Sequence, residues 1–150
     1  MKQFILLLLL TISGISVLAQ VAIEEKTLNL EKGIGLKGYD VVSYFNGEPR
    51  VGESSISKQY EGVWYRFKNQ DNLNTFSQNP EKYIPTFGGY CAYAMGERGA
   101  LVDIDPESFK IINGALYLFY NSYFNNTLKK WNKDEANLLK KAISNWTKYK

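Results

Sequence analysis

The chain of 150 residues contains a single cysteine, Cys91, and no histidine. One cysteine cannot form an internal disulfide, and the absence of histidine excludes histidine-based zinc sites. The chain must therefore fold by packing a hydrophobic core. The same absence excludes Cys–His dyads, Ser–His–Asp triads and haem held by a proximal histidine. For Cys91 this leaves soft-metal binding, redox chemistry, pairing with another chain, or plain packing.

The first 19 residues have the pattern of a signal peptide. A basic start precedes the apolar run Phe4 to Leu10, and small residues lead up to Ala19. The run is short for a bilayer span and is interrupted by polar residues. We expect a signal peptide over residues 1–19, a mature chain that begins near Gln20, and a secreted or periplasmic location without a stable membrane span after cleavage.

The remaining residues, 20–150, have the length of one domain. Their core can draw on many aromatic side chains, since the chain has 11 Tyr, 8 Phe and 3 Trp. The net charge is only +3, which is too small for a protein that binds nucleic acid electrostatically. We therefore expect a single domain that does not bind nucleic acid.

Two hairpins are predicted by their turns. Asn113 and Gly114 separate two apolar runs, and Asn-Gly is typical of a type I′ turn. Glu61 and Gly62 separate residues 57–60 from residues 63–67 in the same way. A third strand is expected at residues 39–45, which are rich in aromatic and β-branched side chains.

Helices are expected between and after these hairpins. Their predicted ranges are 70–78 with Asn69 as cap, a short helix after Pro80, 90–95, 122–131 and about 134–147. In the last one, Leu139, Ile143 and Trp146 form an apolar side. The pattern predicts an α+β fold: a small antiparallel sheet of hairpins packed with short helices and two C-terminal helices.

Glycines 33, 35 and 38 match the spacing G-x-G-x-x-G of dinucleotide-binding loops. That loop requires a helix directly after it, because the helix N–H groups bind the pyrophosphate. The residues that follow favour a strand instead. We expect the glycines to form a turn and not a nucleotide site.

Several stretches resemble, in the same order, those of exported YHS-domain proteins, and together they span about 110 residues. Gly38 to Phe45 is similar to the family's GYDPVAYF start, and Phe87 to Ala94 is similar to its glycine–cysteine segment. The other similar stretches are the aromatic hairpin at 60–67, residues 79–85, residues 113–118, Trp131 and residues 145–146.

The resemblance implies a presumed metal-binding module of a kind that also occurs attached to copper-transporting ATPases and to aromatic monooxygenases. The family is named after Tyr, His and Ser positions, and this chain has no histidine. Only Cys91 therefore carries over by position as a candidate metal ligand.

A Cu(I) site is the metal hypothesis that these residues favour. In a helix over residues 90–95, Cys91 and Met95 would lie four apart on one face. A thiolate and a thioether are soft ligands that suit Cu(I). The alternative is that Cys91 is a small buried hydrophobe and Met95 fills a gap in the core, so that no cofactor is bound.

Two further hypotheses stay open. Cys91 could be a single-thiol redox sensor, since a position at a helix N-terminus favours thiolate. The surplus of aromatic side chains could line a pocket for a small molecule or a protein. We expect no enzymatic activity, because no nucleophile–base pair can be assembled; Asp103 and Asp105 fit a turn, and Asp40 can bond to local backbone.

Overall fold

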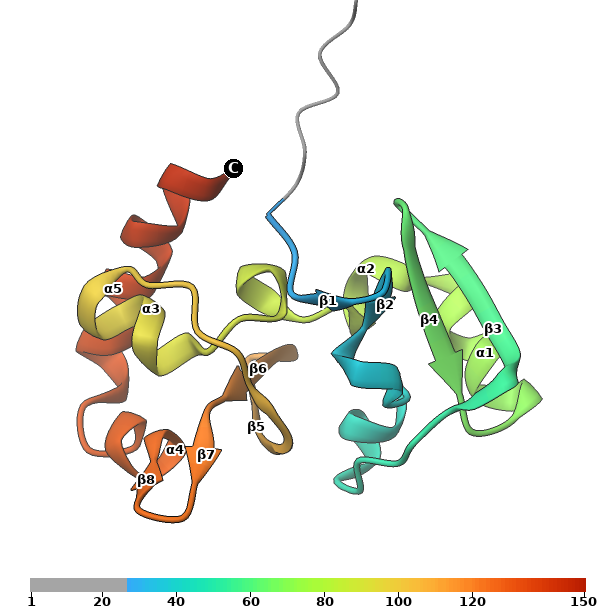
Figure 1. Cartoon of the computed structure of the whole chain (residues 1–150), viewed down its shortest axis with the longest axis horizontal. Helices are drawn as coiled ribbons and strands as arrows, with labels where there is room; N and C mark the ends of the chain where they lie inside the picture. Colours follow the sequence, from blue (N-terminus) through green and yellow to red (C-terminus); the bar gives the residue numbers. More distant parts are fainter. Residues whose placement is uncertain (1–26) are drawn as a thin grey trace, which may run out of the picture.

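A computed structural model describes residues 27–150, and the predicted signal peptide lies outside these described residues. Figure 1 shows an N-terminal lobe, residues 27–84, beside a C-terminal lobe, residues 85–150. The N-terminal lobe contains β1 (Leu30–Glu31), β2 (Ile34–Gly35), β3 (Glu53–Tyr60), β4 (Val63–Phe67), α1 (Gln70–Gln78) and α2 (Pro80–Tyr83). The C-terminal lobe contains α3 (Ala92–Arg98), β5 (Asp105–Ile112), β6 (Ala115–Phe119), β7 (Asn121–Ser122), β8 (Asn125–Asn126), α4 (Thr127–Trp131) and α5 (Glu135–Trp146).

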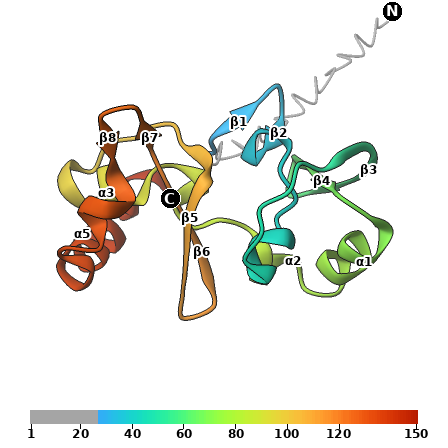
Figure 2. The same ribbon diagram turned by 90° about the horizontal axis from the view of Figure 1, so that it is seen from below.

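The N-terminal lobe is built on a four-stranded sheet in the order β1-β2-β4-β3. Its main unit is the predicted antiparallel hairpin of β3 and β4, with φ of 47° at Glu61 and 82° at Gly62. A single parallel pair, Ile34 with Trp64, joins β2 to β4. Alternate β4 side chains face the core, while Trp64 points to solvent. Figure 2 shows α1 and α2 lying on one side of this sheet.

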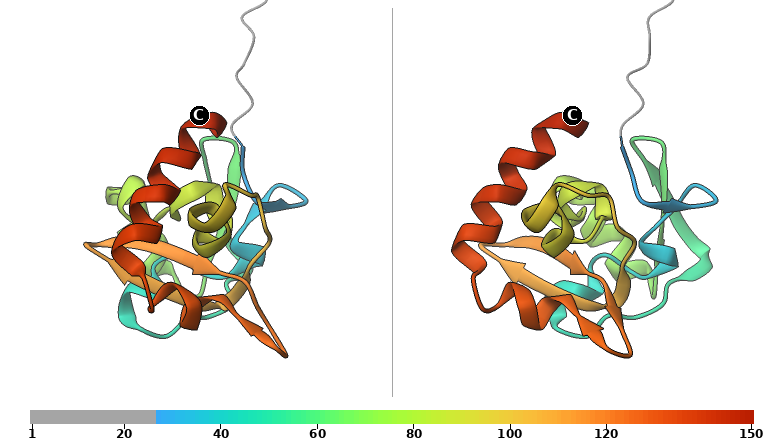
Figure 3. Two further views of the ribbon diagram at one scale, coloured as in Figure 1. Left: turned by 90° about the vertical axis from the view of Figure 1, so that its left-hand side faces the viewer. Right: turned by 60° about the vertical axis from the view of Figure 1, so that its left-hand side comes forward.

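The C-terminal lobe is built on the hairpin of β5 and β6. Asn113 and Gly114 form its turn with φ of 50° and 79°, as the Asn-Gly sequence predicts. Pro85 and Cys91 form parallel bridges to β6, to Leu116 and Leu118. Figure 3 shows α5 running alongside α3 on the side of the lobe away from the N-terminal sheet.

One hydrophobic cluster joins the two lobes. Leu116 and Leu118 of β6 belong to the same buried cluster as Phe67 and Phe76 of the N-terminal lobe. A second cluster surrounds the fully buried Trp131 and includes Met95. The α+β fold predicted from the sequence is confirmed. Within residues 27–150 no helix is long and apolar enough to cross a lipid bilayer.

The strand predicted over residues 39–45 is wrong. Residues Ser43–Asn46 form a 3-10 helix, and Tyr39 makes only an isolated bridge to Val51. The cause is Asp40, whose Oδ1 accepts hydrogen bonds from the N–H groups of Val42 (2.8 Å) and Ser43 (3.4 Å). This side-chain bonding turns the chain away from an extended conformation.

The helix predicted over residues 122–131 exists only in its second half. Residues 121–126 form the small hairpin of β7 and β8, and α4 begins after Asn126. The Asn126 side chain caps α4 by accepting a hydrogen bond from the Lys129 N–H at 2.9 Å. Phe124 lies in the turn of this hairpin and is 95% exposed.

The helix predicted near residues 134–147 is present as α5, but only part of its apolar side packs in the core. The buried positions are Leu138 and Ala142, one residue before the predicted pair Leu139 and Ile143. Ile143 is 56% exposed. The remaining part of the predicted apolar side, with Ile143, faces a groove that is described below.

Gly96 lets α3 and α5 approach closely. A Cβ at this position would lie 2.5 Å from the backbone oxygen of Leu138. Helix propensity alone predicts that Gly96→Ala stabilises the protein by about 1 kcal/mol. Because backbone cannot move aside as a flexible side chain does, we expect a loss of about 2 kcal/mol in unfolding free energy, measured by urea denaturation. A more stable variant would contradict the packing described for α3 and α5.

Candidate functional site

A groove of about 910 Å³ lies between the two lobes and is lined by residues of both. One wall comes from the N-terminal lobe, with Leu28, Leu36 and Tyr65. The opposite wall comes from the C-terminal helix, with Ile143 and Trp146. The volume is within the range found for small-molecule sites, and the lining is mainly apolar and aromatic, as in such sites.

Phe87, Gly88 and Gly89 form the floor of the groove. They belong to the glycine–cysteine segment that resembles YHS domains. Phe87 has φ of 52°, and Gly88 and Gly89 have φ of 59° and 83°. A positive φ is unfavourable for a bulky residue such as Phe87 and persists only where the surroundings hold it. Here the Phe87 ring lies between those of Tyr117 and Trp146, with centroid distances of 5.7 and 5.9 Å.

Gly88 is required by a close approach of three chain segments. A Cβ on Gly88 would lie 2.2 Å from the Thr27 backbone oxygen and 3.0 Å from the Trp146 ring. The Gly88 oxygen accepts a hydrogen bond from the Asn29 N–H at 2.8 Å. The glycines of this motif therefore have a structural role, in which they bring residues 27–29 and Trp146 against the groove floor.

Two tyrosine hydroxyls supply polar chemistry at the groove. Tyr65 and Tyr117 line it and are only 6% and 8% exposed. Neither hydroxyl is among the buried polar atoms that lack a hydrogen-bond partner in the described part of the chain. Burial raises the pKa of both phenols, with a smaller contribution from Glu61 at Tyr65 and from Glu135 at Tyr117. Both therefore stay protonated near neutral pH and can donate to a ligand.

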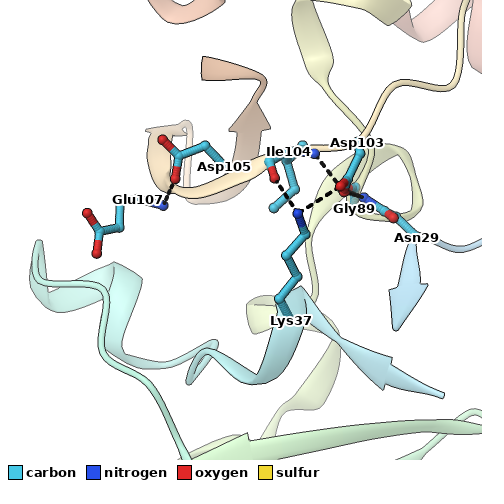
Figure 4. Close-up of polar contacts among 7 residues, drawn as sticks. All are labelled: Asn29, Lys37, Gly89, Asp103, Ile104, Asp105 and Glu107. Atoms are coloured by element: carbon cyan, nitrogen blue, oxygen red, sulfur yellow. Dashed lines mark hydrogen bonds and ion pairs between the residues drawn. The ribbon is translucent and has the colours of Figure 1, made fainter. Parts of the chain in front are cut away.

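A network around Asp103 fixes the edge of the N-terminal lobe to the loop before β5 (Figure 4). Asp103 Oδ2 accepts from Lys37 Nζ at 2.7 Å, and its Oδ1 accepts from Asn29 Nδ2 at 3.0 Å. Asn29 Nδ2 also donates to the Gly89 oxygen at 3.1 Å. Partial burial opposes ionisation, but these hydrogen bonds hold the pKa of Asp103 below its ordinary value.

Asp103 and Asp105 do not form an acid–base pair in this arrangement. Figure 4 shows Asp105 at the other end of the segment, turned toward Glu107, whose N–H it accepts at 3.0 Å. The second Asp105 oxygen accepts from Asn121 Nδ2 at 3.1 Å. Each carboxylate is thus occupied with its own local partners.

Cys91 is fully buried just before α3. The Tyr120 N–H donates to its Sγ at 3.2 Å, and Thr127 Oγ1 lies 3.5 Å from the sulfur. The Thr127 hydroxyl proton already goes to the Tyr120 oxygen at 2.5 Å. The contact between Sγ and Oγ1 therefore suits a protonated thiol that donates to threonine.

Met95 follows Cys91 by one helical turn, and its N–H donates to the Cys91 oxygen at 3.0 Å. The Cys91 side chain belongs to the cluster shared by the lobes, whereas Met95 packs in the cluster around Trp131. The Cys91 Sγ contacts the Thr127 hydroxyl and the Tyr120 N–H, and neither group is a soft metal ligand. Within residues 27–150 no three Cys, Asp or Glu side chains are grouped to hold a metal ion. The Cu(I) site at Cys91 and Met95 stays a prediction from the sequence.

A smaller cavity of about 290 Å³ lies next to Cys91 and is lined by polar side chains that include Glu97, Lys130 and Asn125. The hydrogen bond from the Tyr93 hydroxyl lowers the pKa of Glu97, so its carboxylate is ionised near neutral pH. Asn125 Oδ1 is buried without a hydrogen-bond donor among the described residues. The cavity can accommodate water or a small polar group.

Most of the groove cannot be predicted from the sequence, because its walls come from segments that are far apart in the chain. The surplus of aromatic residues indicated a pocket but could not place it. A second signal was the apolar side of α5, since Ile143 and Trp146 line the groove. A pattern of period 3.6 identifies such a side without showing whether a core or a groove lies against it.

Comparisons with known proteins add no relative. No protein-family model, no curated protein and no solved structure matched this chain. The resemblance to exported YHS-domain proteins therefore rests on the sequence stretches described above, and it stays a prediction.

Proposed function

We propose that this chain is an exported, non-enzymatic module of the YHS type that binds an apolar small molecule in the groove between its lobes. The observation that carries the proposal is the groove itself, about 910 Å³ in volume and lined by aromatic side chains that include the largely buried Tyr65 and Tyr117. A tyrosine offers both an apolar ring and a hydroxyl donor, so these residues can contact an apolar ligand and donate a hydrogen bond to it.

The lining indicates the chemistry of the ligand. Phe87, Trp146 and Tyr149 form a continuous aromatic surface, with centroid distances of 5.9 and 5.5 Å between successive rings. Such a surface favours a flat apolar group. The hydroxyls of Tyr65 and Tyr117 favour a carbonyl, ether or acidic oxygen on that ligand. We infer an apolar compound, with at least one hydrogen-bond acceptor, that fits about 910 Å³.

The proposal is tested with 8-anilinonaphthalene-1-sulfonate, a flat aromatic probe that carries acceptor oxygens and fluoresces in apolar surroundings. We expect saturable binding to one site of the folded protein. In Ile143→Asp the charge lies in the groove wall and must be desolvated when the probe binds, so the affinity should fall about tenfold.

Val51→Asp is the matched control, since Val51 is also well exposed, at 61%, but does not line the groove. Its affinity for the probe should equal that of the unmodified chain. Tyr117→Phe should weaken binding by a smaller factor, because it removes one hydroxyl and keeps the ring. The proposal fails if the folded protein shows no saturable binding, or if the two aspartate variants bind equally well.

A further inference from the structure

The hairpin of β7 and β8 ends in two aromatic residues that face solvent. Tyr123 and Phe124 form its two-residue turn, and each is 95% exposed. Their rings contact each other edge to face, with centroids 5.2 Å apart. Neither residue belongs to a hydrophobic cluster of the fold. Single exposed apolar residues are common on protein surfaces, but a pair of large rings that cover nothing is not.

The turn itself gives no reason for these residues. Short turns favour Gly, Asn, Asp, Ser and Pro, which suit the backbone or bond to it. Tyr123 and Phe124 do neither, and both have negative φ. The polar residues of this hairpin lie beside the tip instead, as Asn121, Ser122 and residues 125–126. Folding therefore accounts for the hairpin but not for its aromatic tip.

We propose that the tip formed by Tyr123 and Phe124 inserts into the interfacial region of a lipid bilayer that carries anionic headgroups. Aromatic rings are favoured at the level of the headgroups, where one end meets acyl chains and the other meets water. The asparagines and serine directly behind the rings would remain among the headgroups, where their hydrogen bonds can be satisfied by water and lipid.

The charges near the tip point to an anionic lipid surface rather than to an apolar protein partner. Lys129 and Lys130 lie on α4, which begins directly after β8, and Lys133 follows that helix. Lys129 and Lys133 take part in no ion pair within residues 27–150. Lysines near a membrane surface are attracted by anionic lipids, and one aromatic insertion with several cations gives reversible attachment.

The position of the hairpin is compatible with a ligand in the groove. In Figure 1 β7 and β8 lie at the bottom of the molecule, whereas the C-terminus and the upper end of α5 lie at the top. Figure 3 shows the hairpin extending beyond the body of the C-terminal lobe. The groove is lined by Trp146 and Tyr149 at that upper end, so the tip can enter a membrane while the groove stays in water.

The test places an environment-sensitive fluorophore next to the tip. Cys91 is fully buried, so a fluorophore that reacts with thiols labels the native Ser122→Cys chain at the new cysteine alone. On vesicles of equal parts phosphatidylcholine and phosphatidylglycerol we expect a blue shift of its emission. A label at Gln59→Cys, an exposed site of β3 next to the turn at the opposite end, should not shift. Because these labels report immersion at one position, membrane contact through another segment cannot produce the pattern.

Binding is then measured by sedimentation with the same vesicles. The double variant Tyr123→Ser and Phe124→Ser should lower the partition coefficient about tenfold, and Lys129→Gln with Lys133→Gln should lower it only where phosphatidylglycerol is present. The tip assignment is overturned if the Ser122 label does not shift, if it shifts no more than the Gln59 label, or if the double serine variant binds as before. Vesicle-independent self-association that disappears in the double serine variant would also overturn it, since the tip would then be a contact between copies.

Discussion

Asp40→Ala lowers the free energy of unfolding by about 3 kcal/mol in our expectation, although Asp40 lies outside the groove. Asp40 is fully buried and accepts hydrogen bonds on both oxygens. Besides the Val42 and Ser43 N–H groups, its carboxylate accepts from the Lys68 N–H at 2.8 Å and from Asn72 Nδ2 at 2.6 Å. Alanine would leave these donors buried without an acceptor. The loss is measured by urea denaturation.

The variant Asp40→Asn separates shape from hydrogen bonding. Asparagine keeps the shape of aspartate, but one of its two terminal groups is a donor and would face other donors. We therefore expect Asp40→Asn to recover little of the lost stability. Glu53→Ala is the control, since Glu53 is an exposed carboxylate of β3, and its effect should stay within about 0.5 kcal/mol. Near-native stability of Asp40→Asn would contradict the network described for Asp40.

Trp131→Ala is expected to cost about 4 kcal/mol of unfolding free energy. Trp131 is the largest fully buried side chain among the described residues. It contacts Phe119 edge to face at 5.4 Å and lies 6.2 Å from the Tyr117 ring. Alanine leaves a cavity between α4, α5 and β6 that the surrounding backbone can fill only in part. Calorimetry or urea denaturation measures the change.

Trp131→Phe is the matched control for Trp131→Ala. It keeps most of the apolar volume but removes the hydrogen bond from Nε1 to Glu135 Oε2, at 2.9 Å. We expect a smaller loss, of about 1–2 kcal/mol. The pKa of Glu135 is lowered first by its hydrogen bond from Lys110 and also by this bond from Trp131, so it should rise slightly in Trp131→Phe. Equal losses for the two variants would show that packing volume is not the main contribution.

Short-range turn signals predicted the fold where one dipeptide decides the local geometry. Asn113-Gly114 and Glu61-Gly62 both adopt the positive φ angles that their hairpins need. Asn69 caps α1 through the Asn72 N–H at 2.8 Å, as its position predicts. These features depend on neighbours within a few residues, which a sequence shows directly.

The sequence was less informative where a side chain overrides the local pattern. Residues 39–45 have the composition of a strand, yet the Asp40 carboxylate binds two following N–H groups and bends the chain. The lobes also meet through contacts between residues more than 50 positions apart, such as Tyr44 Oη with the Pro106 oxygen at 2.8 Å. The groove is formed by such long-range contacts, so the sequence could indicate a pocket without placing it.

The burial of Cys91 gives this protein an internal reporter of its own opening. The thiol lies between α3 and β6, with Sγ held by the Tyr120 N–H. An alkylating reagent can reach it only when these elements separate, whereas the unfolded chain reacts at once. Since the chain has no other cysteine, the rate of modification follows a single event at a known place. The alkylation rate of the Cys91 thiol therefore measures how often the C-terminal lobe opens transiently.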